Sequence, residues 1–416
     1  MASKKFLFIV NRYLPCQSGA EVLTGQIAEK LSSMGHSVKV LTLNAMNDDD
    51  YVQRRSREPQ KANINRVSVR RFKITRLPFH ERVMKTAEEL SVADWLTGRR
   101  AIFSIPMMKS LTKEIGESDV VISGVMPFTG IIYPALITAK RMKKRFVLLP
   151  LMHFGQVGLK SKMNDFEKQT IYPKEFRYEY FSETAMKIYR ESDIILTQGL
   201  YEENFIKNNT KSFFARINPR IEIPEKFQSD HSGFTVFTLG NHNYHKGIEA
   251  TLKAYNLLRK SKADVKLIIS GRVGKEYEEQ IKSTAGVEFM GQSDDKLKRE
   301  CFMKSDVFLL PSIAESLGIA VLEAHSYGIP TIGAYCSGSM QLIKEGVNGY
   351  LVPFMDYRLT YELLMALYEN ASLLERLKSE SRRIASEGDL SIDGYRDGPF
   401  DDSRQEKQIK TFLEMI

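Results

Sequence analysis

Two glutamates, Glu315 and Glu323, stand eight residues apart in an otherwise apolar stretch, "PSIAESLGIAVLEAHSYGIPTIG" at 311–333. The apolar run just before it, Val307–Leu310, predicts a buried strand that is followed by a loop and then a helix. Glu315 would then lie at the carboxyl end of the strand, and Glu323 about two helical turns away, roughly 9–12 Å. Free amides at the start of the helix would lie between the two carboxylates and could bind an anion. These amides belong to the residues Ser316, Leu317, Gly318 and Ile319.

The arrangement suits a diphosphate that carries a hydroxyl-rich group on each side, because carboxylates accept hydrogen bonds from hydroxyls. A ribose would lie by one glutamate and a sugar by the other. The alternative is structural: Glu315 would be a charge at a helix N-terminus, and Glu323 a member of a salt bridge. Glu323 has apolar neighbours in the sequence, and burying its charge without a partner would be costly.

Three further candidates follow other predicted strands. Gly19, in "NRYLPCQSGAE", precedes a helix, so it fits either a turn or a close approach to phosphate. His153 follows "RFVLLPL"; a lone histidine is more often structural, but the end of a strand favours function. Lys246 precedes Gly247 and a helix, so it could meet a phosphate or be an ordinary surface lysine. The first loop is not G-x-G-x-x-G, so the dinucleotide-binding fingerprint is absent from it.

The elements that must position these residues alternate regularly. Apolar strand patterns are "KFLFIV", "HSVKVLTL", "DVVIS", "RFVLLPL" and "DIILT", then "FTVFTLG", "VKLIISG", "VEFMG", "DVFLLP", "TIGAY" and "GYLVP". Continuous apolar strands separated by amphipathic helices indicate parallel sheets covered on both faces. We therefore predict an α/β fold with two doubly wound, Rossmann-like domains, in which ligands bind at the carboxyl ends of the strands.

The domain boundaries follow changes in composition. Residues 1–215 are predicted to form an N-terminal domain, and 233–388 a C-terminal domain. A proline-rich polar segment joins them at 215–233. Within the first domain, 45–115 is predicted to be a basic, irregular and partly helical insert. Residues 389–416 are expected to pack back on the first domain as a loop and a short helix.

Composition places the chain among ordinary soluble globular proteins, with 43% hydrophobic and 27% charged residues. The cysteines Cys16, Cys301 and Cys336 are widely spaced and favour neither a disulfide framework nor a zinc site. The start "MASKKFLFIVNRYLP" fits a first strand better than a secretory signal. The uncharged run Val120–Ala139 is long enough to span a bilayer, but we favour a buried strand followed by a helix that begins near Pro127.

The net charge of +9 is concentrated in one window. From Arg54 to Lys113 there are fifteen Lys or Arg and five Asp or Glu, whereas the rest of the chain is near neutral. Such a field attracts phosphate groups of a lipid surface or an anionic substrate, although an ordinary solvated surface is the alternative. No nucleic-acid-binding motif accompanies the window, so we expect no nucleic-acid partner.

Residues 234–353 resemble the donor-binding half of a retaining GT-B-fold glycosyltransferase of the family called group 1 or family 4. The resemblance rests on the two glutamates of an E-x7-E motif, on "KG" after the first strand, and on the runs "VEFMGQ", "LKRECFMKSDVFLLPS", "EAHSYGIPTIG" and "EGVNGYLVP". More loosely, "SGAEVLTGQIAEKLSSMGHSVKVLT" resembles the family's first loop, helix and strand. The implied architecture has two Rossmann-like domains whose parallel sheets face a central cleft. The resemblance implies that 1–215 is the acceptor-side domain and that 233–388 binds the nucleotide-sugar donor.

The resemblance also implies roles for individual residues. Glu323 would bind the donor ribose, and Glu315 would lie near the transferred sugar. Lys246 would contact the donor phosphates, His153 would help hold the sugar in its reactive pose, and Gly19 would lie near phosphate and acceptor. His153, Lys246 and Glu315 are thus the expected catalytic residues. The implied donor site is completed by Asn241, Arg272, Gly291, Ser316, Leu317, Gly318 and Ile319.

Three positions depart from the family pattern. Asn241 stands where the family usually has an arginine, so a cation is missing beside the diphosphate, and Arg272 is our candidate substitute. The family's G-G-x-x-E becomes "SGSMQ" at 337–341, which ends in Gln341. The first loop has Ser18-Gly19 where two glycines are common.

The implied function is retaining transfer of a sugar from a nucleoside-diphosphate sugar to an acceptor hydroxyl, in cell-surface polysaccharide or glycolipid synthesis. The resemblance implies no cofactor and no metal; we interpret the D-x-D at Asp48–Asp50 as loop. The acceptor is unknown, and an anionic or lipid-linked one is favoured by the basic window. The location expected is cytoplasmic, with peripheral association at the inner face of the membrane as a further expectation. The alternatives are a non-catalytic nucleotide-sugar-binding subunit and a GT-B-fold nucleotide-sugar epimerase or hydrolase.

Overall fold

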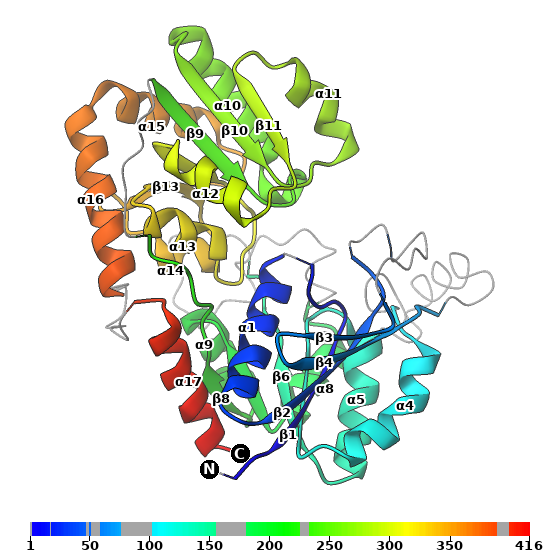
Figure 1. Ribbon diagram of the computed structural model, residues 1–416. Coiled ribbons are helices and arrows are strands. Elements are labelled where there is room, and N and C mark those ends of the chain that lie inside the picture. The colour runs from blue at the N-terminus through cyan, green and yellow to red at the C-terminus, as the bar shows by residue number, and fades with distance from the viewer. Residues whose placement is uncertain are drawn as a thin grey trace. The chain divides into compact units, whose positions relative to one another are not determined.

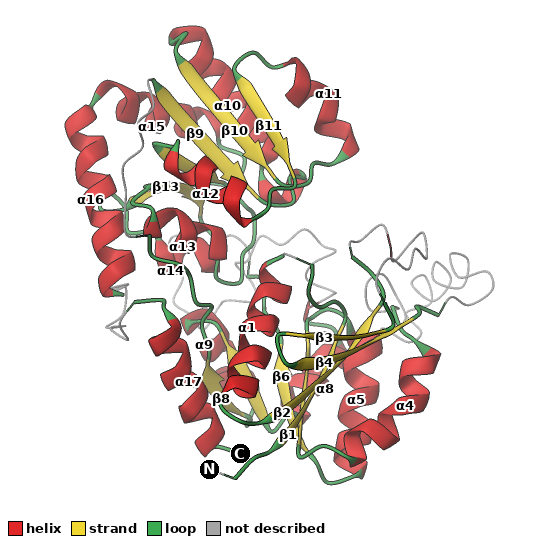
Figure 2. Cartoon of the chain, viewed as in Figure 1, coloured by secondary structure: helices red, strands yellow, loops and turns green. Residues whose placement is uncertain are grey.

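The computed structural model describes residues 2–16, 18–46, 50, 59–75, 102–154, 180–224, 233–388 and 399–416. They belong to two compact units, each built on one sheet (Figures 1 and 2). The first unit comprises Met1–Met152, Pro173–Pro219 and Gln405–Ile416, and the second comprises His153–Tyr172 and Arg220–Arg404. The chain therefore enters the second unit twice, first at His153.

The first unit contains an eight-stranded sheet in the order β3-β4-β2-β1-β5-β6-β7-β8. Its strands are β1 (Lys5–Val10), β2 (Ser37–Leu43), β3 (Lys61–Ile64), β4 (Val67–Phe72), β5 (Val120–Gly124), β6 (Arg145–Leu149), β7 (Ile194–Thr197) and β8 (Phe213–Arg216). All neighbours are parallel except β3 and β4. The parallel core confirms the fold class predicted from the apolar runs.

The β3–β4 hairpin corrects the sequence prediction, which made 45–115 an irregular insert. Its turn residues, Asn65 and Arg66, have φ of 50° and 68°. Positive φ at both central residues is typical of a type I′ turn, whose twist suits two antiparallel strands. The usual sequence signal for this turn is Asn-Gly, but here the second residue is Arg66, so the turn was not predicted. Most of the basic window, including 76–101, lies outside the described residues.

The helices of the first unit include α1 (Gly19–Ser33), α4 (Ile105–Gly116), α5 (Thr129–Arg141), α8 (Glu183–Glu191), α9 (Leu200–Asn209) and α17 (Asp402–Glu414), whose first three residues fall in the second unit. On one face of the sheet, Phe6 and Phe8 of β1 join a core that also contains Ile27 of α1. Ile409 and Phe412 of α17 lie in the same core and are fully buried. The last helix is therefore an integral part of the first unit.

The second unit contains a fully parallel six-stranded sheet in the order β11-β10-β9-β12-β13-β14. Its strands are β9 (Phe234–Leu239), β10 (Val265–Ser270), β11 (Val287–Gly291), β12 (Val307–Leu310), β13 (Thr331–Ala334) and β14 (Gly349–Val352). Alternate residues of β12 face opposite cores: Val307 and Leu309 belong to one, Phe308 and Leu310 to the other. A strand buried on both faces explains the continuous apolar run in the sequence.

Helices pack against both faces of the second sheet. The first core contains residues of α10 (Ile248–Ser261), α11 (Lys275–Ser283), α15 (Tyr357–Glu369) and α16 (Ala371–Glu387). The second contains residues of α12 (Asp295–Met303), α13 (Ile319–Ser326), α14 (Ser337–Leu342) and, again, α16. The unit is thus the doubly wound domain expected from the alternating pattern.

The uncharged run Val120–Ala139 is divided between β5 and α5, as expected. The helix begins at Thr129 rather than near Pro127. In the part of the chain that the structure describes, no helix is long and apolar enough to cross a membrane.

Candidate functional site

The carboxyl ends of the strands of the second sheet lie together at one edge, because all of these strands are parallel. Backbone hydrogen bonds then join the loops at this edge. The His242 amide donates to the Arg272 carbonyl at 2.7 Å, which links the loops after β9 and β10. The Ile313 amide donates to the His245 carbonyl at 2.9 Å, which links the loops after β9 and β12. The predicted residues Asn241, Lys246, Arg272 and Glu315 therefore share one edge of one sheet.

Lys246 ends a short 3₁₀ turn, Tyr244–Lys246, and its ammonium group forms an ion pair with Glu315 Oε1. Gly247 follows with a φ of 68°. A Cβ at this glycine would lie 2.3 Å from the Pro311 carbonyl oxygen, so any side chain would force the two loops apart. The "KG" pair thus brings a cation onto the first glutamate of the E-x7-E motif.

Glu315 is buried, with 7% of its surface exposed. Burial raises the pKa of its carboxyl, but the Lys246 ammonium and the charge of His153 outweigh burial, so the net pKa is lowered. The carboxylate is therefore ionised at neutral pH. A buried, paired carboxylate beside a cation is a strong electrostatic feature at the end of β12.

The segment that follows β6 reaches the same place. Phe154 forms an antiparallel bridge with Glu315, and both carbonyls accept a hydrogen bond from the Ser337 hydroxyl, at 3.2 and 2.8 Å respectively. His153, directly before Phe154, is half-buried. Three predicted catalytic residues, His153, Lys246 and Glu315, are thus gathered in the second unit.

The start of α13 offers the amides predicted from the sequence. In the described chain, the amides of Leu317, Gly318 and Ile319 have no backbone acceptor. The Ser316 hydroxyl is buried and has no hydrogen-bond partner among the described residues. Among the residues that the structure describes, these donors have no acceptor, which is the property expected of an anion site.

Glu323 forms a salt bridge, which is the structural alternative considered for it from the sequence. Its side chain is 21% exposed, and its Oε1 atom accepts from Lys298 Nζ of α12 at 2.6 Å. Burial lowers the pKa of Lys298, but Glu323 and Asp295 raise it more. One oxygen of Glu323 is therefore held by a cation, and among the described residues the other has no hydrogen-bond partner.

Arg272 and Asn241 lie on adjacent loops at the ends of β10 and β9. Arg272 donates through Nε and Nη2 to Gln292 Oε1, at 3.3 Å in both cases. Gln292 follows Gly291, the last residue of β11, so three neighbouring loops meet here. In the described chain the Arg272 guanidinium pairs with no carboxylate, whereas Asn241 is exposed.

Gly19 lies in the first unit, as the first residue of α1 after Ser18. Close by, the buried Glu21 accepts from Ser18 Oγ and, at 2.9 Å, from Arg12 Nε. The D-x-D at 48–50 has only Asp50 among the described residues; its carboxylate accepts from the Met46 amide at 2.8 Å. In the described ranges no group of three or more His, Cys, Asp or Glu residues could hold a metal ion.

Comparison with known proteins shows what this part of the chain is similar to. Residues 219–384 match the family model of group 1 glycosyl transferases. The matched segment falls almost wholly in the second unit and contains Lys246, Arg272, Glu315 and Glu323. The match supports the predicted resemblance for this unit.

One curated relative is a phosphatidyl-myo-inositol mannosyltransferase of Mycobacterium leprae, which is 32% identical over 167 residues. That match covers 38% of this chain and 44% of the relative, so the chain spans less than half of that relative's length.

The fold is similar over the whole chain. An Anabaena protein, HepE, solved with UDP and glucose, aligns with a TM-score of 0.67 at 16% identity and covers 99% of this chain and all of that one. Sucrose-phosphate synthase of Thermosynechococcus elongatus aligns with a TM-score of 0.71 at 14% identity, over 99% and 98% of the two chains. Identity this low shows the fold alone, and it confirms the predicted GT-B class.

Two further residues that contact the predicted site residues were not predicted from the sequence. Lys298 is 25 residues from Glu323, with no spacing rule to connect them. Ser337 was noted only as a departure from glycine, yet its hydroxyl joins the carbonyls of Phe154 and Glu315. A polar residue in place of a family glycine was the available signal.

Proposed function

We propose that the protein is a retaining glycosyltransferase that moves a sugar from a nucleoside-diphosphate sugar to an acceptor hydroxyl. The observation that carries the proposal is the cluster of Lys246, Glu315 and His153 next to the unpaired amides of α13. It combines a cation, an ionised carboxylate and hydrogen-bond donors at the carboxyl edge of a parallel sheet. Diphosphate, sugar and ribose are the three groups that this set can bind.

In this proposal Lys246 and the α13 amides bind the diphosphate and stabilise the negative charge that grows on it as the bond to the sugar breaks. Glu315 and His153 hold the sugar hydroxyls, and Glu323 accepts from the ribose. The acceptor oxygen attacks the anomeric carbon on the face that the phosphate leaves, and its proton passes to the departing phosphate oxygen. The bond to phosphate breaks, the bond to acceptor forms, and no covalent intermediate with the protein is needed.

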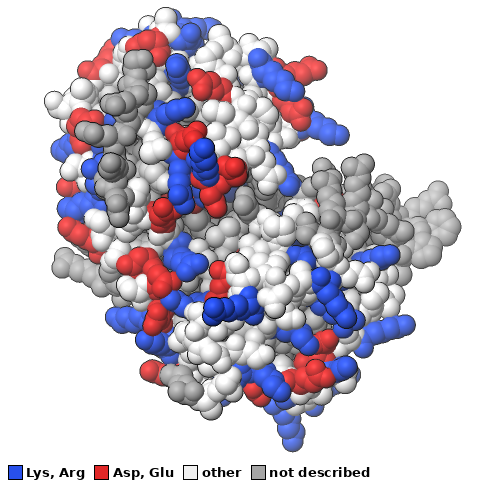
Figure 3. Space-filling model, in the orientation of Figure 1, with Lys and Arg blue, Asp and Glu red and all other residues white. Residues whose placement is uncertain are grey.

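Similar proteins support the donor class. One relative is named as a mannosyltransferase acting on phosphatidyl-myo-inositol, another is a putative glycosyltransferase of Bacillus subtilis, and a structural neighbour was solved with UDP and glucose. By analogy, we propose a role in cell-surface polysaccharide or glycolipid synthesis, with an anionic or lipid-linked acceptor at the inner face of the membrane. Basic and acidic side chains are interspersed over the described face in Figure 3, so the basic window remains the main reason for an anionic acceptor.

The test is a thermal-shift screen with UDP, GDP, UDP-glucose and GDP-mannose, followed by measurement of nucleotide release. A ligand that binds only the folded protein raises its melting temperature. We expect one nucleotide series to stabilise the wild type, and Lys246→Ala to lose most of that shift. Stabilisation by none of these ligands would contradict the proposal.

The outcome also separates the alternatives suggested by Asn241 and Gln341. Donor binding without turnover by any acceptor would favour a non-catalytic subunit, and activity gained by Asn241→Arg would strengthen that conclusion. A donor sugar that is altered or released without an acceptor would favour an epimerase or hydrolase.

A further inference from the structure

The backbone just before His153 has an unusual conformation. Leu151 has a φ of 50° and is 5% exposed, in a region of backbone space that favours glycine. Pro150, one residue earlier, accepts from the Met126 amide at 3.0 Å. Such a turn persists only where its surroundings hold it in place. The residues that hold it therefore help to decide where His153 lies.

A buried carboxylate from another element holds this turn. Glu202, in the first turn of α9, is 2% exposed. Its Oε1 atom accepts from the Met152 amide at 2.6 Å, and its Oε2 atom accepts from the Gln198 amide. Each carboxylate oxygen thus has one backbone donor, one of them on the residue that directly precedes His153.

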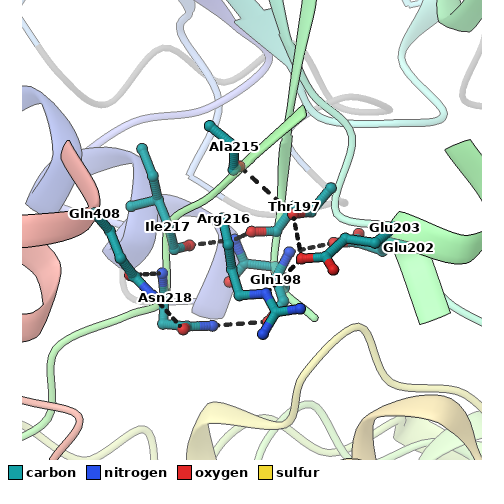
Figure 4. A network of polar contacts seen from close by, with 9 residues as sticks. All are labelled: Thr197, Gln198, Glu202, Glu203, Ala215, Arg216, Ile217, Asn218 and Gln408. Atoms are coloured by element: carbon teal, nitrogen blue, oxygen red, sulfur yellow. Dashed lines mark hydrogen bonds and ion pairs between the residues drawn. The ribbon is translucent and has the colours of Figure 1, made fainter. Parts of the chain in front are cut away.

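The other end of this bridge is itself fixed (Figure 4). Gln198 Nε2 donates to the Ile217 carbonyl at 2.7 Å, and the Gln198 carbonyl accepts from Asn218 Nδ2 at 2.7 Å. Asn218 exchanges two hydrogen bonds with Gln408 of α17, both of 2.8 Å. The Met152 amide is therefore connected through Glu202 to a network that spans β7, β8 and α17.

We propose that Glu202 is a positioning residue that sets the place of His153 by holding the Met152 amide. The hydrogen bonds that carry this inference all lie within the first unit, which includes Met152, the residue before His153. The effect of Glu202 on turnover rests on the proposed function, in which His153 holds the donor sugar.

Burial dominates the electrostatics of Glu202. Burial raises the pKa of Glu202 to about 8, although the amides of Gln198 and Met152 favour the ionised form. The neighbouring Glu203 raises the pKa and Arg216 lowers it. A glutamate at this depth is costly unless its hydrogen bonds are needed.

Glu203 provides a matched control at the next position. It is also buried, at 6% exposed, but its carboxylate accepts from Arg216 Nε and from the Thr197 hydroxyl, not from the His153 segment. Glu203→Gln therefore disturbs the same helix turn and the same network without removing an acceptor from Met152.

The experiment compares Glu202→Gln, Glu203→Gln and wild type in the full chain labelled with ¹⁵N-histidine. The His153 ring signals are assigned among the seven histidines with His153→Gln. In Glu202→Gln the side-chain NH₂ group replaces one of the two oxygens, so one of the two backbone amides loses its acceptor. We therefore expect displaced His153 signals and a changed titration midpoint for His153. Glu203→Gln should lower the melting temperature but leave the His153 signals in place.

Turnover supplies the second readout, as UDP release from UDP-glucose. Glu202→Gln should lower kcat about tenfold or more with little change in KM, and it should have no further effect in a His153→Gln background. His153 signals that are unchanged in Glu202→Gln, or moved equally by Glu203→Gln, would overturn the inference. Displaced signals together with a His153→Gln variant of normal kcat would uphold the positioning role and remove His153 from the proposed function.

Discussion

The Glu323 carboxylate has one oxygen held by Lys298 and the other without a partner in the described chain. The held oxygen fixes the rotamer, and the remaining one can accept from a ribose hydroxyl. We expect Glu323→Ala to weaken UDP binding by about 5- to 150-fold, since hydrogen bonds to charged groups contribute roughly 1–3 kcal/mol. Isothermal titration calorimetry measures it.

The control for this variant is Glu380→Ala, which removes another carboxylate that pairs with a cation, Arg383, on α16. Its UDP affinity should equal that of wild type. Unchanged affinity in a folded Glu323→Ala protein would remove Glu323 from the site.

Arg272 is the second prediction at this scale. Asn241 carries no charge where the resemblance implies a cation. Arg272 lies on the adjacent loop, and its side-chain partner among the described residues is the neutral Gln292. We expect Arg272→Ala to lower turnover by about 10²-fold, because it would remove a cation from the leaving diphosphate. Asn241→Arg added to that variant should recover part of the loss. If Arg272→Ala leaves turnover unchanged while Lys246→Ala lowers it strongly, Lys246 supplies the positive charge alone.

Site residues could be predicted from the sequence where the chemistry is local. The two glutamates, the Lys246–Gly247 pair and the strand before Pro311 all lie in short segments with clear patterns. Partners that come from distant segments could not be predicted. Lys298 meets Glu323, and Glu202 meets the Met152 amide, only because the chain folds. Nothing in the sequence around Lys298 or Glu202 indicates these contacts.

Among the structural elements, the 3₁₀ turn at Tyr244–Lys246 depends on the glycine that follows it. Gly247 and Gly346 have nearly equal φ, 68° and 70°, but a Cβ at Gly346 would meet nothing within 4 Å. We expect Gly346→Ala to cost about 1 kcal/mol of unfolding free energy, from backbone strain alone. Gly247→Ala should cost clearly more, because its Cβ would collide with Pro311, and it should also weaken UDP binding by moving Lys246.

Denaturant unfolding and UDP titration of the two variants decide this point. Equal losses of stability and equal affinities would mean that the loop contact at Pro311 is not needed.

The larger elements were predictable to the extent that their patterns were periodic. All strands of the second sheet were expected from apolar runs. Most of them are buried on both faces, whereas β11, at the edge of the sheet, is half-exposed. The β3–β4 hairpin was not, since its strands are short, half-exposed and rich in basic residues such as Arg70 and Arg71. Its pairing is stabilised at the edge of the first sheet rather than by its own sequence.

For the whole molecule, acid should destabilise the second unit through two buried histidines. Burial lowers the pKa of His242 to about 4 and that of His325 to about 3, from an ordinary value of 6.5. As the pH falls below 6.5, the unfolded chain takes up a proton at each site before the folded chain does. Each histidine should therefore remove about 1.4 kcal/mol of unfolding free energy per pH unit, until the folded pKa is reached.

Unfolding of wild type and His325→Gln between pH 6 and 4.5 measures this slope. In the variant, the slope of the unfolding free energy against pH should be smaller by about 1.4 kcal/mol per pH unit, which corresponds to one proton. A slope identical to that of wild type would show that His325 is protonated in the folded protein.

Metal dependence is also a property of the whole protein. We expect turnover to persist in EDTA, because Lys246 and the α13 amides supply the positive charge that a metal would otherwise provide. Nucleotide release assayed with and without chelator tests this. Complete loss that Mg²⁺ or Mn²⁺ restores would contradict the assignment of that role to protein groups.

The position of α17 in the core of the first unit has a consequence for biosynthesis. During translation the other segments of the first unit are synthesised before most of the second unit, and α17 is synthesised after it. Until then the apolar side chains of the first unit that pack against Ile409 and Phe412 remain exposed to solvent. The second unit can fold as soon as it emerges, since domains generally fold as units during synthesis. The domain that is translated first is thus the last to be completed, and a nascent chain stalled before α17 is the form most in need of a chaperone.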